Sequence, residues 1–503
     1  MFKTNRMRWG ALLALIGTTF GAHRLYSAHA RDLDAPAGTS KPVEPVSPPK
    51  RHGGETVVSG NVPPAWVQAG DETVQLTAQL DRTAVLKDGE GTVHVEVVVK
   101  TKDVEGTVAR VPSDIVVVVD RSGSMGGEKI AYAKRALEQL IERLRPEDRF
   151  ALVTYDDEAQ LRVPLTTATS EARRAWLREV SSLQVGGSTN MSAGLDLGHR
   201  ELARARLANR AGRVLLLSDG LANQGDSSFE GLVGRARRAV TSEYVLSTIG
   251  IGADFDERLM TALASSGTGA FYYLAKLETL PVLLDAELKT ATETLARSAE
   301  LRLRPGKGVR VVSASGLPIT HEGDEAVIAL GSLYADHERK LWLTLEAPTD
   351  ALRDLEIGDV RLRYRKADEV HELQSPALPK LACVADPATF RARLVRDVWE
   401  RAVVEEELTH AQEKLGDAIK SGSAAEVDAV VSKARARLEL AKDLGAQHAV
   451  AGIGTLTADA ESARRAQAAP APVRAAAAKA AKARGYNERN KSAYKNVDPS
   501  LSY

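Results

Sequence analysis

Hydrophobic and polar residues alternate along two separate stretches of the chain, before residue 110 and after residue 298. In the first stretch, valines stand at every second position from Val93 to Val99. The second stretch repeats the pattern in short runs that Gly and Pro separate, such as Leu341 to Leu345. Such alternation predicts half-buried antiparallel strands. We therefore expect an N-terminal β block at 65–110 and a C-terminal β block at 295–385, joined in a β-sandwich.

The region between these blocks has a different pattern. Ile115 to Val119 and Val214 to Leu217 are continuous apolar runs, which are typical of strands buried on both faces. Helical spacing separates the runs, for example from Ile130 to Leu144. Strands that alternate with helices predict a doubly wound α/β sheet. The region 111–290 is therefore expected to be an α/β domain inserted between the β blocks.

The pattern becomes helical again near the C-terminus. Phe390, Leu394, Val398 and Ala402 recur every four residues, and Gly422 interrupts the spacing. This predicts a helical hairpin over 387–445. The remaining segment, 446–503, is rich in Ala, Pro, Lys and Arg, and we expect a mostly disordered tail.

The first 30 residues have the pattern of a secretory signal. A basic start is followed by about 12 mostly apolar residues, Trp9 to Phe20, and by Ala28-His29-Ala30. An uncleaved anchor is the alternative, although roughly 20 apolar residues are needed to span a bilayer. Residues 31–64 are rich in Pro, Gly and Ser, which predicts a disordered linker. We expect an exported protein of the periplasm, of the cell surface or secreted, with no membrane span after the signal segment.

The charge balance and the cysteine content restrict the kinds of partner and of covalent cross-link that we expect. The chain has 67 Lys and Arg against 67 Asp and Glu, so its net charge gives no reason to expect nucleic acid as the main partner. Cys383 is the single cysteine and cannot form an internal disulfide. It stands in an apolar run, where a free cysteine usually behaves as a small buried hydrophobe.

Oxygen-bearing side chains follow the predicted strands. Asp120-Arg121-Ser122-Gly123-Ser124 comes directly after the first buried strand, and Asp219 ends the strand 213–218. A glycine-rich loop, Gly186 to Asn190, opens the helix before that strand. Ligands of open α/β sheets bind at the carboxyl ends of the strands. The expected site comprises Asp120, Ser122, Ser124, Thr189 and Asp219. An all-oxygen set favours Mg²⁺, Ca²⁺ or Mn²⁺ over zinc, whereas the alternative is that both aspartates only cap helices and loops.

These three pieces resemble the metal-ion-dependent adhesion site of von Willebrand factor type A domains in order and spacing. The resemblance implies a Rossmann-like sheet, a bound divalent cation such as Mg²⁺, and recognition of a protein ligand through an acidic residue. The flanking β blocks resemble those of bacterial exported members. Many members have Gly-Gly-Thr-Asn where this chain has Gly-Gly-Ser-Thr-Asn, which makes Ser188 an alternative ligand. We prefer Thr189, because Asn190 then keeps its place after it.

The expected function is divalent-cation-dependent protein–protein binding, in adhesion or scaffolding, without catalysis. The loops 186–191 and 221–228 are expected to form the rim of the site. In related domains, ligand binding is coupled to movement of the last helix, here about 277–288. One rival is an Mg²⁺-dependent phosphatase of the haloacid dehalogenase type, in which a strand-end Asp is the nucleophile. Such a phosphatase usually has a second Asp two residues after the nucleophile, which acts as acid and base. This chain has Ser122 at that position. The other rival is a structural envelope protein with a vestigial metal site.

Overall fold

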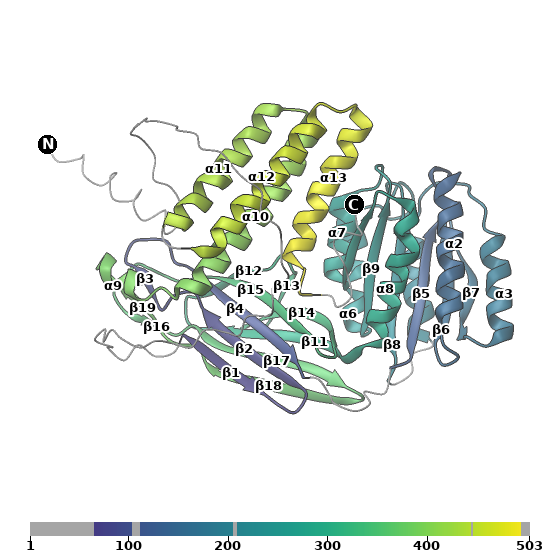
Figure 1. The fold of residues 1–503 in the computed structure, drawn as a ribbon. Coiled ribbons are helices and arrows are strands. Elements are labelled where there is room, and N and C mark those ends of the chain that lie inside the picture. Colours follow the sequence, from purple (N-terminus) through teal and green to yellow (C-terminus); the bar gives the residue numbers. More distant parts are fainter. Residues whose placement is uncertain (1–64, 103–110, 205–208, 444–445, 494–503) are drawn as a thin grey trace, which may run out of the picture.

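The structure, a computed structural model, describes residues 65–102, 111–204, 209–443 and 446–493. The predicted signal peptide (1–30) and linker (31–64) lie outside the described residues. The described residues form a β-sandwich, an α/β domain beside it and a group of long helices that lies against both (Figure 1).

The β-sandwich combines strands from both flanking blocks. The first sheet has the order β1 (Trp66–Gly70), β2 (Val74–Leu80), β4 (Thr92–Thr101), β15 (Glu338–Glu346) and β12 (Arg310–Ala314). The second has the order β13 (Ile319–Glu322), β14 (Glu325–Tyr334), β11 (Thr294–Pro305), β17 (Gly358–Lys366) and β18 (Glu369–Ala377). β16 (Asp354–Leu355), β19 (Leu381–Val384) and β3 (Ala84–Leu86) form a small third sheet. The apolar positions of the alternating strands, such as Val95, Leu343 and Leu301, share one core.

The α/β domain is built on a six-stranded sheet, which contains the predicted continuous apolar runs. Its order is β10 (Thr268–Leu274), β9 (Tyr244–Ile251), β8 (Ala211–Ser218), β5 (Ser113–Asp120), β6 (Arg149–Tyr155) and β7 (Ala159–Thr167). β5 pairs in parallel with both β6 and β8, whereas β7 is an antiparallel edge strand. The predicted Rossmann-like α/β fold is thus confirmed.

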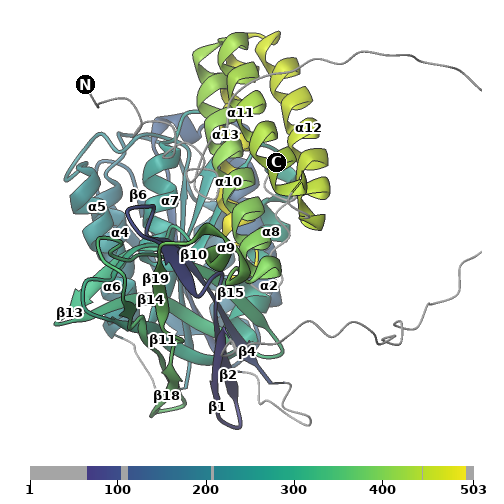
Figure 2. The same cartoon turned by 90° about the vertical axis from the view of Figure 1, so that its left-hand side faces the viewer.

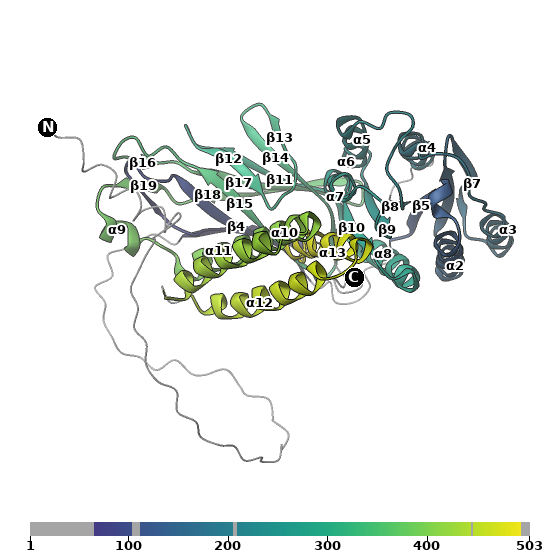
Figure 3. The same ribbon diagram turned by 90° about the horizontal axis from the view of Figure 1, so that it is seen from above.

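Helices cover both faces of this sheet (Figure 3). One face carries α2 (Glu128–Arg143), α3 (Ser170–Ser181) and α8 (Leu280–Thr292). The other carries α4 (Met191–Arg204), α5 (Phe229–Ala236), α6 (Arg238–Thr241) and α7 (Glu257–Ser266). Two 3₁₀ turns, η1 (Gly123–Met125) and η2 (Leu277–Thr279), precede α2 and α8. Each face of the sheet therefore has its own hydrophobic core.

The sandwich supports the α/β domain at the edge where the parallel strands begin. β11 starts at Thr294, directly after α8 ends. At this junction Arg297 donates to the carbonyl of Arg210, and Arg365 pairs with Glu243 at 3.1 Å. The carboxyl ends of the parallel strands consequently lie at the opposite edge of the sheet.

The C-terminal region differs from the prediction of a mostly disordered tail over 446–503, whereas the predicted interruption at Gly422 separates two helices within 387–445. The short α9 (Pro387–Ala392) is followed by the long helices α10 (Arg396–Ser421), α11 (Ala424–Asp443), α12 (Gln447–Gln467) and α13 (Ala471–Arg489), which lie together in Figure 2. The Ala-rich segment forms helices, because Ala is the strongest helix former. Small side chains such as Ala478 and Ala481 are buried against neighbouring helices. Within the described ranges, no helix combines the length and apolarity that a membrane span requires.

Candidate metal centre

Two aspartates lie at the carboxyl ends of two neighbouring parallel strands. Asp120 is the last residue of β5, and Asp219 directly follows β8. The two strands are paired up to Val119 and Leu217. Both aspartates are fully buried. The doubly wound sheet thus places two carboxylates next to each other, as the sequence predicts.

The loop after β5 brings its two serines to these carboxylates. The backbone N–H of Ser122 donates to Asp120 Oδ1 at 2.8 Å. The hydroxyls of Ser122 and Ser124 lie 3.1 Å apart. Ser124 Oγ in turn donates to Asp219 Oδ1 at 2.8 Å. Hydrogen bonds of this loop therefore connect the two strand ends.

Thr189 reaches the same place from the third loop. A Cβ atom built on Gly220 would lie 3.4 Å from both Ser124 Oγ and Thr189 Oγ1, so these hydroxyls flank one glycine. Asn223 holds Thr189 in two ways: its Oδ1 accepts from Thr189 N at 2.8 Å, and its own N donates to Thr189 O at 3.1 Å. The structure therefore brings all five predicted residues to one edge of the sheet.

Two partners of these residues were not predicted from the sequence. Ser218 Oγ donates to Asp120 Oδ2 at 2.7 Å, and Asn223 holds Thr189 as described. The position of Ser218, at the end of a buried strand directly before Asp219, is the signal that could have indicated it. Asn223 stands in an exposed loop, and its sequence position gives no such signal.

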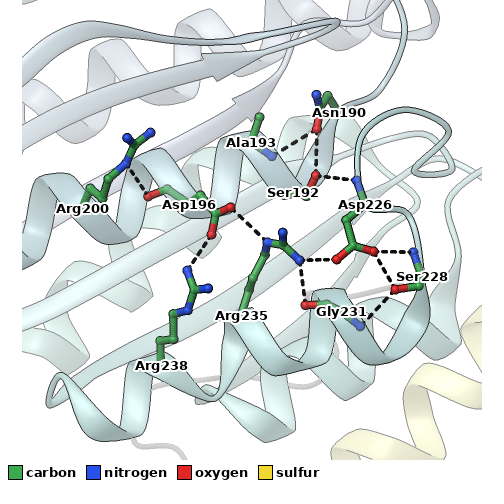
Figure 4. A network of polar contacts seen from close by, with 10 residues as sticks. All are labelled: Asn190, Ser192, Ala193, Asp196, Arg200, Asp226, Ser228, Gly231, Arg235 and Arg238. Carbon is green, nitrogen blue, oxygen red and sulfur yellow. Dashed lines mark hydrogen bonds and ion pairs between the residues drawn. The ribbon is translucent and has the colours of Figure 1, made fainter.

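A polar network fixes the loops around the site (Figure 4). Asn190 Oδ1 accepts from Ala193 N and so caps the start of α4. It also accepts from Ser192 Oγ. Ser192 Oγ also accepts from Asp226 N at 3.1 Å, which ties the loop after β8 to α4. Arg235 then pairs with Asp226 at 2.6 Å and with Asp196 at 3.1 Å. The loops that carry Thr189 and Asn223 are thus anchored to α4 and α5.

Comparison with known proteins agrees with the fold of the α/β domain. A family model described as "von Willebrand factor type A domain" matches residues 114–286. These residues form a von Willebrand factor type A domain. Such domains are in general modules of protein–protein interaction and adhesion and not enzymes.

Several relatives are similar to part of this chain. "Uncharacterized protein YfbK" of Escherichia coli (strain K12) is 28% identical over 38% of this chain and 33% of its own length. "Uncharacterized protein sll0103" of Synechocystis is 29% identical over 51% and 62%, respectively. Inter-alpha-trypsin inhibitor heavy chain H1 of Sus scrofa is 26% identical over 44% of this chain and 25% of its own. The chain thus spans less than two thirds of each of these relatives.

A solved structure shows that the likeness in fold extends beyond the von Willebrand factor type A domain. The structure titled "von Willebrand factor type A from Catenulispora acidiphila" has a TM-score of 0.61 at 19% identity. The alignment covers 79% of this chain and 92% of that one. The matched domain, residues 114–286, is much shorter than the 79% of this chain that the alignment covers. The strands and helices that flank the domain are therefore part of the common fold.

The electrostatics of the site in the von Willebrand factor type A domain favour a bound cation. Burial raises the pKa of Asp120, and the charge of Asp219 raises it further, although hydrogen bonds from Ser122 and Ser218 lower it. Two buried carboxylates side by side need positive charge for compensation. Lys129 Nζ, another group that was not predicted, supplies one such charge at 2.5 Å from Asp219 Oδ2.

The donor set fits a hard divalent cation. It contains two carboxylates and three hydroxyls, all oxygen, as Mg²⁺, Ca²⁺ and Mn²⁺ prefer. Among the described residues, no group of three or more His, Cys, Asp or Glu side chains is placed to hold a metal. A metal at this site would consequently rely on the serine and threonine hydroxyls. Cys383 is buried in the sandwich, away from this chemistry.

Proposed function

We propose that the chain binds a protein partner through a divalent cation held at this site, with no catalytic step. The observation that carries the proposal is the convergence of Asp120, Ser122, Ser124, Thr189 and Asp219 from three loops at one edge of the sheet. von Willebrand factor type A domains commonly bind a divalent metal at such a site. Mg²⁺ is the proposed cation, with Ca²⁺ or Mn²⁺ as substitutes.

The proposed division of roles follows from the chemistry of the side chains. Asp120 and Asp219 provide negative charge that offsets the desolvation of the cation, directly or through water. The three hydroxyls add neutral oxygen ligands and no further charge. When bound, the cation supplies Lewis acidity for a carboxylate of the partner. We therefore propose a partner that presents an exposed Asp or Glu.

The rim gives the partner further contacts. Leu221, two residues after Asp219, is 56% exposed, and Val185, in the loop before Thr189, is 39% exposed. Large apolar side chains at the edge of a polar site are suited to protein contacts. The pattern of residues 1–30 supports a further proposal, that this binding takes place outside the cytoplasm.

Calorimetric titration of the full chain with Mg²⁺ and Mn²⁺ tests the proposal. We expect saturable binding that is lost in Asp120→Asn and in Asp219→Asn. Glu158→Gln is a matched control, because Glu158 is an exposed acid at the same edge and its replacement removes the same charge. Binding in Glu158→Gln should equal that of the wild type.

The rival functions give different results. No binding of either ion to the wild type would favour a vestigial site. Robust Mg²⁺-dependent phosphatase turnover that disappears in Asp120→Asn would overturn the binding function. A pull-down with wild type and Asp120→Asn, each with Mg²⁺ and with a chelator, would then identify cation-dependent partners.

A further inference from the structure

The carboxylate of Asp219 already has a cationic partner within the chain. Lys129 stands in the first turn of α2, directly after the loop that carries Ser122 and Ser124. Its Nζ lies 2.5 Å from Asp219 Oδ2, while Asp219 Oδ1 accepts from Ser124 Oγ at 2.8 Å. The Asp219 side chain is fully buried, and that of Lys129 is 24% exposed. Both oxygens of Asp219 are thus engaged by this chain's own groups.

The position of the Lys129 side chain is defined by the end of a third strand. A Cβ atom built on Gly252, which follows β9, would lie 3.5 Å from Lys129 Cε and 3.8 Å from its Nζ. Gly252 has a φ of 72°, a conformation that suits glycine. The backbone after β9 therefore lies close to the Lys129 side chain, which extends from α2 to the end of β8.

The other carboxylate is held differently. Asp120 Oδ1 accepts from the backbone N–H of Ser122, and its Oδ2 accepts from the hydroxyl of Ser218. Both donors are neutral. The formal charges of Asp120, Asp219 and Lys129 add up to −1, so that a bound dication would bring the total to +1. This remaining charge would favour a carboxylate from the partner.

We propose that the Lys129 ammonium is a built-in counter-ion of Asp219 that competes with the divalent cation and lowers the metal affinity of the site. The proposal rests on the cation-dependent function proposed above. A dication can bind in two ways. It can displace the ammonium, which breaks the ion pair, or it can bind beside the ammonium, which repels it. Affinity decreases in both cases.

The test compares neutral and charged replacements in the full chain. Mg²⁺ is titrated by calorimetry into wild type, Lys129→Met and Lys129→Arg. Lys134→Met is the matched control, because Lys134 lies on the same helix and donates to Ser181 O at 2.9 Å, away from the aspartates. We expect Lys129→Met to bind Mg²⁺ about tenfold more tightly or better, since a unit charge is removed next to the cation. The other two variants should stay within about threefold of the wild type, because they keep the charge at Asp219.

A second measurement and a second variant distinguish a change in metal affinity from a folding defect. Free Mn²⁺ is measured by electron paramagnetic resonance, and Lys129→Gln is prepared beside Lys129→Met; thermal melts show which variants are folded. Equal or weaker binding of both ions in the folded neutral variants, with normal binding in the wild type, would overturn the role of Lys129 alone. Failure of the wild type and of the neutral variants to bind either ion would overturn the proposed function as well.

Discussion

Helix α8 is fixed to the sheet by a buried ion pair that can be broken without touching the candidate site. Glu287 Oε2 lies 2.5 Å from Arg213 Nη1, and the two side chains are 2% and 3% exposed. Tyr272 OH donates to the other oxygen of Glu287 at 2.6 Å. Arg213 Nη2 also donates to Tyr334 OH of the sandwich at 3.1 Å. The pair therefore joins α8, the last helix of the α/β domain, to the sheet of that domain and to the sandwich.

We expect Glu287→Ala to lower the free energy of unfolding by about 3–5 kcal/mol, because the buried charge of Arg213 loses its compensation. For a domain of this size, each kcal/mol lowers the melting temperature by roughly 2–4 °C. The melting temperature should then decrease by roughly 6–20 °C. Asp285→Ala on the same helix is the control, since Asp285 pairs with Arg143 at the surface, where both side chains are 40% exposed or more. Its expected cost is below about 1 kcal/mol.

Thermal melts followed by circular dichroism, together with urea unfolding, measure both variants. The double variant Arg213→Met/Glu287→Met adds a test of cause, because it removes both charges and replaces them with apolar side chains of similar volume. It should be more stable than Glu287→Ala. If Glu287→Ala costs no more than Asp285→Ala, or if the double variant is the less stable of the two, the explanation by an uncompensated charge is wrong.

Three further predictions concern the sandwich and the helices α4 and α5. Burial lowers the pKa of His94, but its hydrogen bonds to Asp81 and Glu406 raise that pKa from 6.5 to about 9. The stabilisation, on the order of 3 kcal/mol, is fully present below pH 6.5 and should be lost as the pH rises through 9. Urea unfolding at several pH values should show this decrease in wild type and not in His94→Gln. Gly198→Ala would place a Cβ 2.7 Å from Val118 Cγ2 and should cost about 1–3 kcal/mol. Gly234→Ala, with nothing within 4 Å, should stabilise by about 0.5–1 kcal/mol in the same thermal melts.

Periodicity predicted the fold where burial is regular. Ile115 to Val119 and Val214 to Leu217 lie side by side in the sheet because strands buried on both faces have unbroken apolar runs. The alternating strands of the two flanking blocks meet directly, with Val95 opposite Leu343. Strand β7 was not predicted, since most of its residues are half-buried or exposed at the sheet edge and carry no regular pattern.

The candidate site was predictable to the extent that its ligands follow strand ends. Asp120 and Asp219 could be located in this way, because topology alone brings the ends of β5 and β8 together. Lys129 and Asn223 could not, because their roles depend on contacts between loops distant in the sequence. A lysine in the first turn of a helix is ordinarily a surface residue, and nothing in its neighbourhood along the chain indicates Asp219.

Helix α13, which the sequence analysis did not predict, packs against the domain that carries the site. Lys479 on α13 donates to the carbonyl of Phe255, and its ammonium lies 4.0 Å from the centre of the Phe255 ring. Tyr486 packs edge-on against Phe271, with ring centres 5.8 Å apart. Phe255 belongs to the loop that begins at Gly252, next to Lys129. Contacts of α13 therefore reach the loop after β9, whose first residue lies beside Lys129, and the C-terminal helices pack against the domain that carries the site.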